Sequence, residues 1–351
     1  MKGRVKGFRG SLNLAVTMVA AVILATGCSG GDKSDEYVRI EGAGIGTTYR
    51  IVAHTGKENI RRIVDAADSI FNMMTMSVSI YDSTSLLSRI NRGETDSVDC
   101  HIERLLEMAA EVSELSDGKY DVTVAPLTEA YGFAGGDKPK HTPNIDSLME
   151  FVGYRKVSVV DGRLVREDKR MQLDFNSIAK GYTVDLIAGA IDSMGIADYM
   201  VEVGGEIVCR GKNPLSGMWR VAVDSPVDGN MTPGENCQVV LKLTDCGMAT
   251  SGNYRRFYID ENGRKIAHTI DPTTGRSAVS NLLSATVIAP TSAEADALGT
   301  MCMSVGLERA KELISSLPDV SAYLIYVDEG SDREGEFRVW HSPGMRKMIA
   351  Q

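Results

Sequence analysis

Segments with the two-residue hydrophobic period of a strand are interleaved with segments that have the 3.6-residue period of a helix along this chain of 351 residues. Several strand-like segments follow one another directly, without the intervening helix that a regular parallel order requires. This order is the strongest constraint on the fold. It predicts an α+β architecture in which mixed or antiparallel sheets pack against helices.

The segments can be placed by their periodicity and by the glycines that end them. Ile102, Leu105, Leu106 and Ala109 form one apolar stripe, and Gly306 separates two helices near the C-terminus. Helices are predicted at 58–71, 102–115, 177–194, 293–305 and 307–315. Strands are predicted at 49–53, 156–160, 200–209, 219–223, 238–243, 256–259, 284–289 and 322–327.

The N-terminus has the order of a secretory signal. A basic start leads into an apolar run from Leu14 to Ala25, shorter than the ~20 residues that a permanent membrane-spanning helix needs. Cys28 follows Gly27 at the end of this region and resembles the lipidated cysteine of a bacterial lipobox. We expect residues 1–27 to be a lipoprotein signal peptide, 28–40 the lipid-bearing Cys28 with its tether, and 41–351 the folded domain. The alternative is an ordinary cleaved signal peptide with an incidental cysteine. Both place the domain outside the cytoplasm, and lipidation would anchor it to the cell membrane on the periplasmic side.

The chain carries a formal net charge of −9, and the basic residues of the signal region do not belong to the expected mature protein. An acidic surface repels polyphosphates, so nucleic acid is not an expected partner. A phosphate-bearing ligand would need a local device, such as a metal ion or backbone amides. With 43% hydrophobic and 24% charged residues, the composition is typical of a globular protein and excludes a disordered or coiled-coil one.

Five cysteines remain beyond Cys28. None forms a CxxC pair or has a His at metal-ligand spacing, so the pattern disfavours zinc. Their odd number precludes complete pairing within the chain, and a hairpin bridge between Cys237 and Cys246 is left open.

Two segments have the residue types of a phosphate and metal site. A strand is expected to end at Asp174 and a helix to open near Ser177, so unpaired amides would face an anion there, with Lys180 on the same turn. Asp296 and Thr300 are four residues apart, which places both side-chain oxygens on one face of a helix. Carboxylate, hydroxyl and carbonyl oxygens favour Mg²⁺ over zinc. A plain helix cap and a chance spacing are the alternatives.

A third segment places His268 just before a tight turn at 271–275. His268 is a candidate general base, although a turn-flanking strand residue would have the same pattern. Two glycine-containing segments, 44–49 and 118–127, either bring backbone close to a ligand or form simple turns; in the second, Asp121 follows Gly118.

Together, these segments resemble the motifs of the ApbE family, the bacterial FAD:protein FMN transferases. The resemblance runs from about residue 42 to residue 345, and Ile45 stands where the family has Met. The matching motifs lie in order at 45–47, 81–91, 121–127, 178–185, 203–206, 250–252, 268–275 and 294–297.

The resemblance implies a T-fold-like architecture and an enzyme that uses Mg²⁺ to transfer the FMN moiety of FAD onto a Thr or Ser hydroxyl of a target protein, releasing AMP. It implies FAD contacts from Ile45, Tyr81, Lys119, Tyr120, Asp121, Asp174, Lys180 and Ile270. It implies metal ligands at Ser177, Asp296, Gly299 and Thr300. The catalytic residues would be His268 or Asp271 as the base, with Lys180 steadying the pyrophosphate.

The implied targets are extracytoplasmic flavoproteins with an acceptor hydroxyl, such as subunits of membrane redox pumps. Two alternatives remain open. The same site could pass the phosphoryl group to water, as an Mg²⁺-dependent FAD pyrophosphatase that gives FMN and AMP. The chain could also be a flavin-binding lipoprotein without turnover.

Overall fold

The computed structural model describes residues 21–22, 36–135, 139, 143–227, 236–254, 257–278, 280–328 and 336–350. Cys28, most of the signal region and most of the tether lie outside the described residues. Within the described part of the chain, no helix combines the length and the apolar character needed to cross a membrane.

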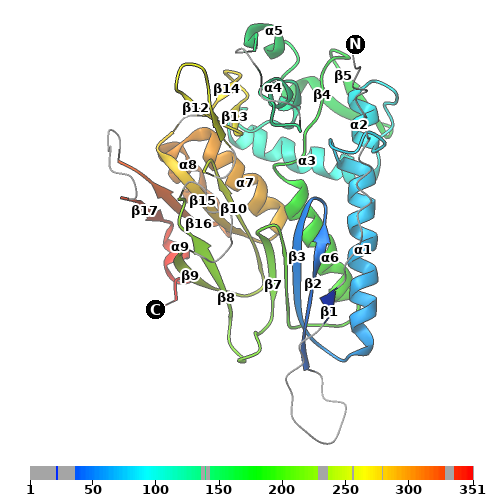
Figure 1. Cartoon of the computed structure of the whole chain (residues 1–351), viewed down its shortest axis with the longest axis vertical. Helices are drawn as coiled ribbons and strands as arrows, with labels where there is room; N and C mark the ends of the chain where they lie inside the picture. The colour runs from blue at the N-terminus through cyan, green and yellow to red at the C-terminus, as the bar shows by residue number, and fades with distance from the viewer. Residues whose placement is uncertain are drawn as a thin grey trace, which may run out of the picture.

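Most of the strands in the described part form one nine-stranded antiparallel sheet with the order β1-β2-β3-β6-β7-β10-β15-β16-β17 (Figure 1). Its strands are β1 (Ala21–Val22), β2 (Glu36–Gly44), β3 (Thr47–Thr55), β6 (Tyr199–Val203), β7 (Glu206–Arg210), β10 (Cys246–Gly252), β15 (Leu282–Ala289), β16 (Ser321–Tyr326) and β17 (Arg338–His341). Four two-stranded sheets are β4 (Val157–Val160) with β5 (Arg163–Arg166), β8 (Trp219–Asp224) with β9 (Cys237–Leu243), β11 (Phe257–Ile259) with β12 (Lys265–Ala267), and β13 (Ile270–Asp271) with β14 (Arg276–Ser277).

The helices are α1 (Glu58–Val78), α2 (Leu86–Asn91), α3 (Cys100–Leu115), α4 (Ala125–Ala130), α5 (Ile145–Met149), α6 (Ala179–Ser193), α7 (Ser292–Val305), α8 (Leu307–Ser316) and α9 (Pro343–Arg346), with short 3-10 turns at Val122–Val124 and Tyr154–Lys156. Three residues of the predicted apolar stripe of α3 are buried, and the fourth, Leu106, is half-buried at its edge. The Asp99 side chain caps this helix by accepting hydrogen bonds from the His101 and Ile102 amides. The break between α7 and α8 falls at Gly306, as the sequence indicated.

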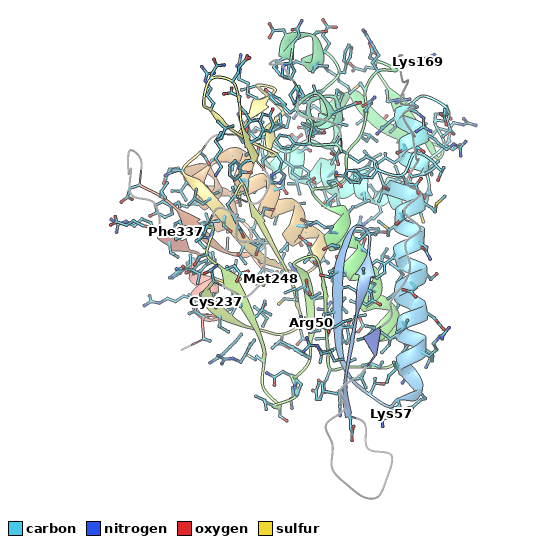
Figure 2. The ribbon with its side chains drawn as sticks, in the orientation of Figure 1. Arg50, Lys57, Lys169, Cys237, Met248 and Phe337 are labelled. Carbon is cyan, nitrogen blue, oxygen red and sulfur yellow. The ribbon has the colours of Figure 1, made fainter. Side chains whose placement is uncertain are left out.

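Successive side chains of a strand point to opposite sides, so the large sheet has apolar side chains on both faces. Other elements cover both of these faces. On one face, Val208 of β7 packs with Val184 and Ile187 of α6. On the same face, α7 packs against β10 and β15, and α3 packs against α7. On the other face, Ile207 and Met248 pack against the β8–β9 hairpin and α9; Figure 2 labels Met248 within β10. The α+β prediction with antiparallel sheets is therefore confirmed. Several candidate site residues described below belong to α6 and α7, which cover the first of these two faces.

Local predictions needed three corrections. The strand expected at 200–209 is two strands, because Gly204 and Gly205 form a hairpin turn with φ of 62° and 106°, a left-handed region that suits glycine. The first helix continues beyond residue 71 to Val78. The strand expected to end at Asp174 is not formed: residues 171–175 have no regular secondary structure, and α6 begins at Ala179. The Cys237–Cys246 bridge, which the sequence left open, is not formed either, since both thiols are free and Cys246 lies opposite Cys209 of β7.

Candidate active site

Helices α6 and α7 approach each other closely at the N-terminus of α7. A Cβ at Gly181 of α6 would lie 2.3 Å from the Ser292 carbonyl oxygen, so only glycine allows this contact. One turn further, the Asp185 carboxylate accepts hydrogen bonds from the amides of Ser292 and Ala293 at 2.9 and 2.8 Å. Burial raises the pKa of Asp185 to about 6, although these two hydrogen bonds act in the opposite direction. These contacts fix α7 relative to α6.

The predicted metal residues of α7 lie beside this contact. Asp296 is buried, and its Oδ2 accepts a hydrogen bond from the Gly181 amide at 3.0 Å. One turn along the helix, the Thr300 Oγ1 lies 3.4 Å from the Ser251 Oγ of β10, and Gly299 packs against the same serine. Carboxylate and hydroxyl oxygen atoms therefore gather between α6, α7 and β10.

Lys180 lies between two buried carboxylates in this cluster. Its Nζ is 2.5 Å from the Glu206 Oε1 and 3.8 Å from the Asp296 Oδ1. Glu206 is the first residue of β7, directly after the Gly204-Gly205 turn, and only 4% of its side chain is exposed. Burial is the main cause that raises the pKa of Glu206 to about 7; Asp296 raises it further, and the Lys180 ammonium opposes both.

The loop before α6 connects this cluster to a second group of predicted residues. Ser177 donates a hydrogen bond from its Oγ to the buried Tyr120 hydroxyl at 2.8 Å, and burial strongly raises the pKa of that phenol. Asp174 accepts a hydrogen bond from the Asn176 amide at 2.8 Å and is buried. The Asn176 side chain in turn donates to the hydroxyl of Tyr81, a residue that is 55% exposed. The predicted FAD residues 81, 120 and 174 are thus joined to Ser177 by a short chain of contacts.

Lys119 lies next to Tyr120 and forms an ion pair of 2.5 Å with the Asp271 carboxylate. Burial acts to raise the pKa of Asp271, but the hydrogen bonds from Lys119 and Thr273 outweigh it, and the pKa is lowered. The Lys119 carbonyl oxygen also accepts a hydrogen bond from Ser304 near the end of α7. Lys119 therefore joins the β13 turn to α7.

His268 lies in the link between β12 and β13, half-buried, with the Phe133 ring in an edge-on contact at 6.3 Å between centroids. The neighbouring Thr269 donates a hydrogen bond to the Asn253 side chain at 2.8 Å, in the segment that follows β10. Because Ser251 lies only two residues before Asn253, the segment of His268 is attached to the same end of β10 that faces Thr300.

Three other predicted residues have structural partners. The Asp121 carboxylate accepts hydrogen bonds from the backbone amides of Thr123 and Tyr154, so it organises the turn before α4. Ile45 lies in the β2–β3 turn and packs against the core, and Ile270 packs in a separate apolar cluster with Leu127.

The donor set fits a hard divalent cation. Two buried acidic side chains, Asp296 and Glu206, face the single Lys180 ammonium, so the acidic groups outnumber the basic one here. The Glu206 Oε2 is buried and has no hydrogen-bond partner within the described residues. In the same part of the chain, no three His, Cys, Asp or Glu side chains converge, so hydroxyl and carbonyl oxygens would have to complete any coordination shell. Such an all-oxygen set suits Mg²⁺.

A sequence profile of the ApbE family matches residues 45–324, which is most of the chain. The chain belongs to the ApbE family. The family that the motifs predicted is thereby confirmed.

Curated members of the ApbE family are similar over nearly the whole chain. The FAD:protein FMN transferases of Haemophilus influenzae and Escherichia coli K12 are both 31% identical, covering 88% and 95% of this chain and 92% and 97% of their own lengths. The flavin transferase ApbE of Vibrio cholerae superposes with a TM-score of 0.78 at 27% identity, covering 90% of this chain and 99% of that one. The apo flavinyl transferase ApbE of Pseudomonas stutzeri also has a TM-score of 0.78, at 26% identity, covering 90% and 97%.

Sequence reasoning assigned no role to three residues of the site, although each lies in a quoted ApbE motif. These are Asp185, which caps α7, Glu206, which contacts Lys180, and Ser251, which faces Thr300. The sequence does contain one signal for Glu206, which directly follows a pair of glycines. Such a pair favours a tight hairpin turn, and the first side chain after the turn can then point toward the interior.

Proposed function

We propose that this chain transfers the FMN moiety of FAD onto a Thr or Ser hydroxyl of an extracytoplasmic protein, in an Mg²⁺-dependent reaction that releases AMP. The reaction class, FAD:protein FMN transferase, is that of its family and of the curated relatives. The observation that supports the Mg²⁺ dependence is the buried Asp296 carboxylate, which lies with the Thr300 hydroxyl on one face of α7 and beside a second buried acidic group, Glu206.

In this proposal, Asp296, Thr300, Ser177 and the Gly299 carbonyl would hold the ion. When bound, Mg²⁺ supplies positive charge that offsets the negative charge on the pyrophosphate oxygens. The loop before α6, with Asp174 and Ser177, and the exposed ring of Tyr81 would bind FAD next to it.

The chemical step needs a base for the acceptor hydroxyl. Of the two candidates, the structure favours His268 over Asp271, because the Asp271 carboxylate is held by Lys119 and Thr273 and its pKa is lowered. His268 takes the proton from the acceptor hydroxyl, and that oxygen attacks the phosphorus of the FMN half of FAD. The bond from this phosphorus to the bridging oxygen breaks, and AMP leaves with that oxygen. Lys180 steadies the pyrophosphate during the exchange.

The test is to incubate the purified chain with FAD, Mg²⁺ and an acceptor domain, and to measure the acceptor by mass spectrometry and the released nucleotide by chromatography. Transfer predicts a flavin-labelled acceptor together with AMP. Free FMN with AMP and no labelled acceptor would identify a pyrophosphatase, and bound flavin without AMP would identify a binding protein. Asp296→Asn should abolish metal-dependent turnover; a variant with wild-type turnover would contradict the assigned metal site.

We also propose that Cys28 carries lipid and anchors the domain on the extracytoplasmic face of the membrane. The support is the sequence order of basic start, apolar run and cysteine. Metabolic labelling with a radioactive fatty acid should mark the wild-type chain and not Cys28→Ala. Equal labelling of both would contradict the proposal.

A further inference from the structure

Lys180 has two buried acidic neighbours, and it lies much closer to one of them. The Nζ–Oε1 distance to Glu206 is 2.5 Å, against 3.8 Å from Nζ to the Asp296 Oδ1. The other oxygen of Asp296, Oδ2, already accepts the Gly181 amide. The Asp296 oxygen that lacks this backbone partner is therefore the one that faces the ammonium.

We propose that Glu206 is a positioning residue that holds the Lys180 ammonium away from Asp296 and so keeps the Asp296 Oδ1 open to a divalent cation. This inference rests on the cation site proposed above. It gives a role to a buried carboxylate that the reaction itself does not use.

The geometry of β7 makes Glu206 suited to this role. The tight Gly204-Gly205 turn joins β6 to β7, and Glu206 pairs with Val203 at the start of the ladder. The Gly205 amide is also fixed by a hydrogen bond to the Glu202 side chain at 2.9 Å. A carboxylate on such a short, paired hairpin moves little, whereas Lys180 has a long flexible side chain. The position of the ammonium is thus set by the glutamate.

Removing the charge of Glu206 should change which carboxylate the ammonium contacts. In a buried site the attraction between opposite charges is strong, and an ammonium that loses one carboxylate moves to the other. A shift of little more than 1 Å would bring Lys180 into direct contact with the Asp296 Oδ1. The lysine would then compete with a cation for that oxygen.

The experiment measures Mn²⁺ binding to the full-length chain in detergent without FAD, from the electron paramagnetic resonance signal of free Mn²⁺. We expect Glu206→Gln to raise the dissociation constant by about tenfold or more. The double variant Glu206→Gln with Lys180→Met should bind Mn²⁺ within about threefold of the wild-type chain, because no ammonium then competes for Asp296. Lys180→Met alone should bind at least as tightly as wild type. Thermal unfolding of each variant checks that it is folded.

Two results would overturn the role of Glu206 alone. Unchanged Mn²⁺ binding in Glu206→Gln would show that the ammonium does not compete. A loss that Lys180→Met fails to restore would show that Glu206 is itself a ligand. The control is Asp296→Asn, which should abolish binding. If it binds Mn²⁺ like wild type, the proposed cation site is wrong and this inference fails with it, so the two failures are distinguishable.

Discussion

Gly181→Ala tests whether the close contact between α6 and α7 sets the position of Asp296. A Cβ at this position would meet the Ser292 carbonyl oxygen at 2.3 Å and the Ala293 Cα at 2.8 Å, and both are backbone atoms that cannot rotate away. The two helices would have to separate by on the order of 0.7 Å to bring the first contact to 3.0 Å. The same displacement would lengthen the hydrogen bond from the residue 181 amide to Asp296.

Gly181→Ala should lower both the stability and the activity of the protein. Overpacking of this kind costs about 1–3 kcal/mol, and the better helix propensity of alanine returns up to about 1 kcal/mol. A net cost of about 1–2 kcal/mol, in the middle of the range that these figures allow, corresponds at about 2–4 °C per kcal/mol for a sizeable domain to a fall in Tm of about 2–8 °C. A misplacement approaching 1 Å at the site can reduce the rate by up to about a hundredfold. The rate of acceptor flavinylation should fall by between tenfold and a hundredfold.

The matched control is Gly189→Ala in the same helix. Nothing lies within 4 Å of a Cβ at Gly189, and the residue is exposed. This variant should be as stable as wild type or slightly more stable, because alanine is the better helix former, and it should keep its activity. Scanning calorimetry and the flavinylation assay compare the two variants. If Gly181→Ala matched Gly189→Ala in both Tm and rate, the contact would not position the site as argued.

Three further perturbations have defined outcomes. The pKa of Asp185 in the folded state, about 6, exceeds its ordinary value of 3.8. The folded state therefore binds this proton more tightly than the unfolded state does. As a result, the free energy of unfolding falls by on the order of 3 kcal/mol as the pH rises from about 4 to about 6. Asp185→Asn should remove this part of the slope in a plot of Tm against pH, and a slope equal to that of wild type would contradict the assignment. Chelation of divalent cations should stop AMP release, and added Mg²⁺ should restore it; AMP release that persists after exhaustive chelation would rule out the metal dependence. His268→Ala should lower the transfer rate by about 10²–10⁴-fold with FAD affinity little changed in a flavin fluorescence titration, and a loss confined to FAD affinity would exclude His268 as the base.

Periodicity located the secondary structure well where one side of an element is apolar. The stripe of apolar residues at 102, 105, 106 and 109 predicted α3, and Gly306 predicted the end of α7. Element ends were harder to predict, as with α1, because helix termini depend on tertiary packing. The strand order could not be derived in this way. Pairing of β3 with β6 and of β7 with β10 joins segments far apart in the chain, and no local pattern records such partners.

In the candidate site, too, features within one element could be predicted from the sequence, and contacts between elements could not. Spacing alone placed Asp296 and Thr300 on one helical face, since four residues make about one turn. The ion pairs of Lys119 with Asp271 and of Lys180 with Glu206 were not predictable, because each joins segments from separate elements. From the sequence alone, a lysine in a motif is expected to offer its positive charge to a ligand, because its carboxylate partner is seen only in the structure.

These pairings change how an acidic protein can bind an anionic substrate. With a net charge of −9, the chain offers no general attraction for a pyrophosphate, so the attraction must be local. Yet Lys119 and Lys180, the two lysines predicted to contact FAD, each have a carboxylate at 2.5 Å. A paired ammonium attracts a phosphate less strongly, because the carboxylate offsets its charge. Either the lysines exchange partners when FAD binds, or the positive charge comes from a cation held by oxygen ligands. The buried Asp296 carboxylate and the Thr300 hydroxyl, which lie on one face of α7, favour the second explanation for most of this positive charge.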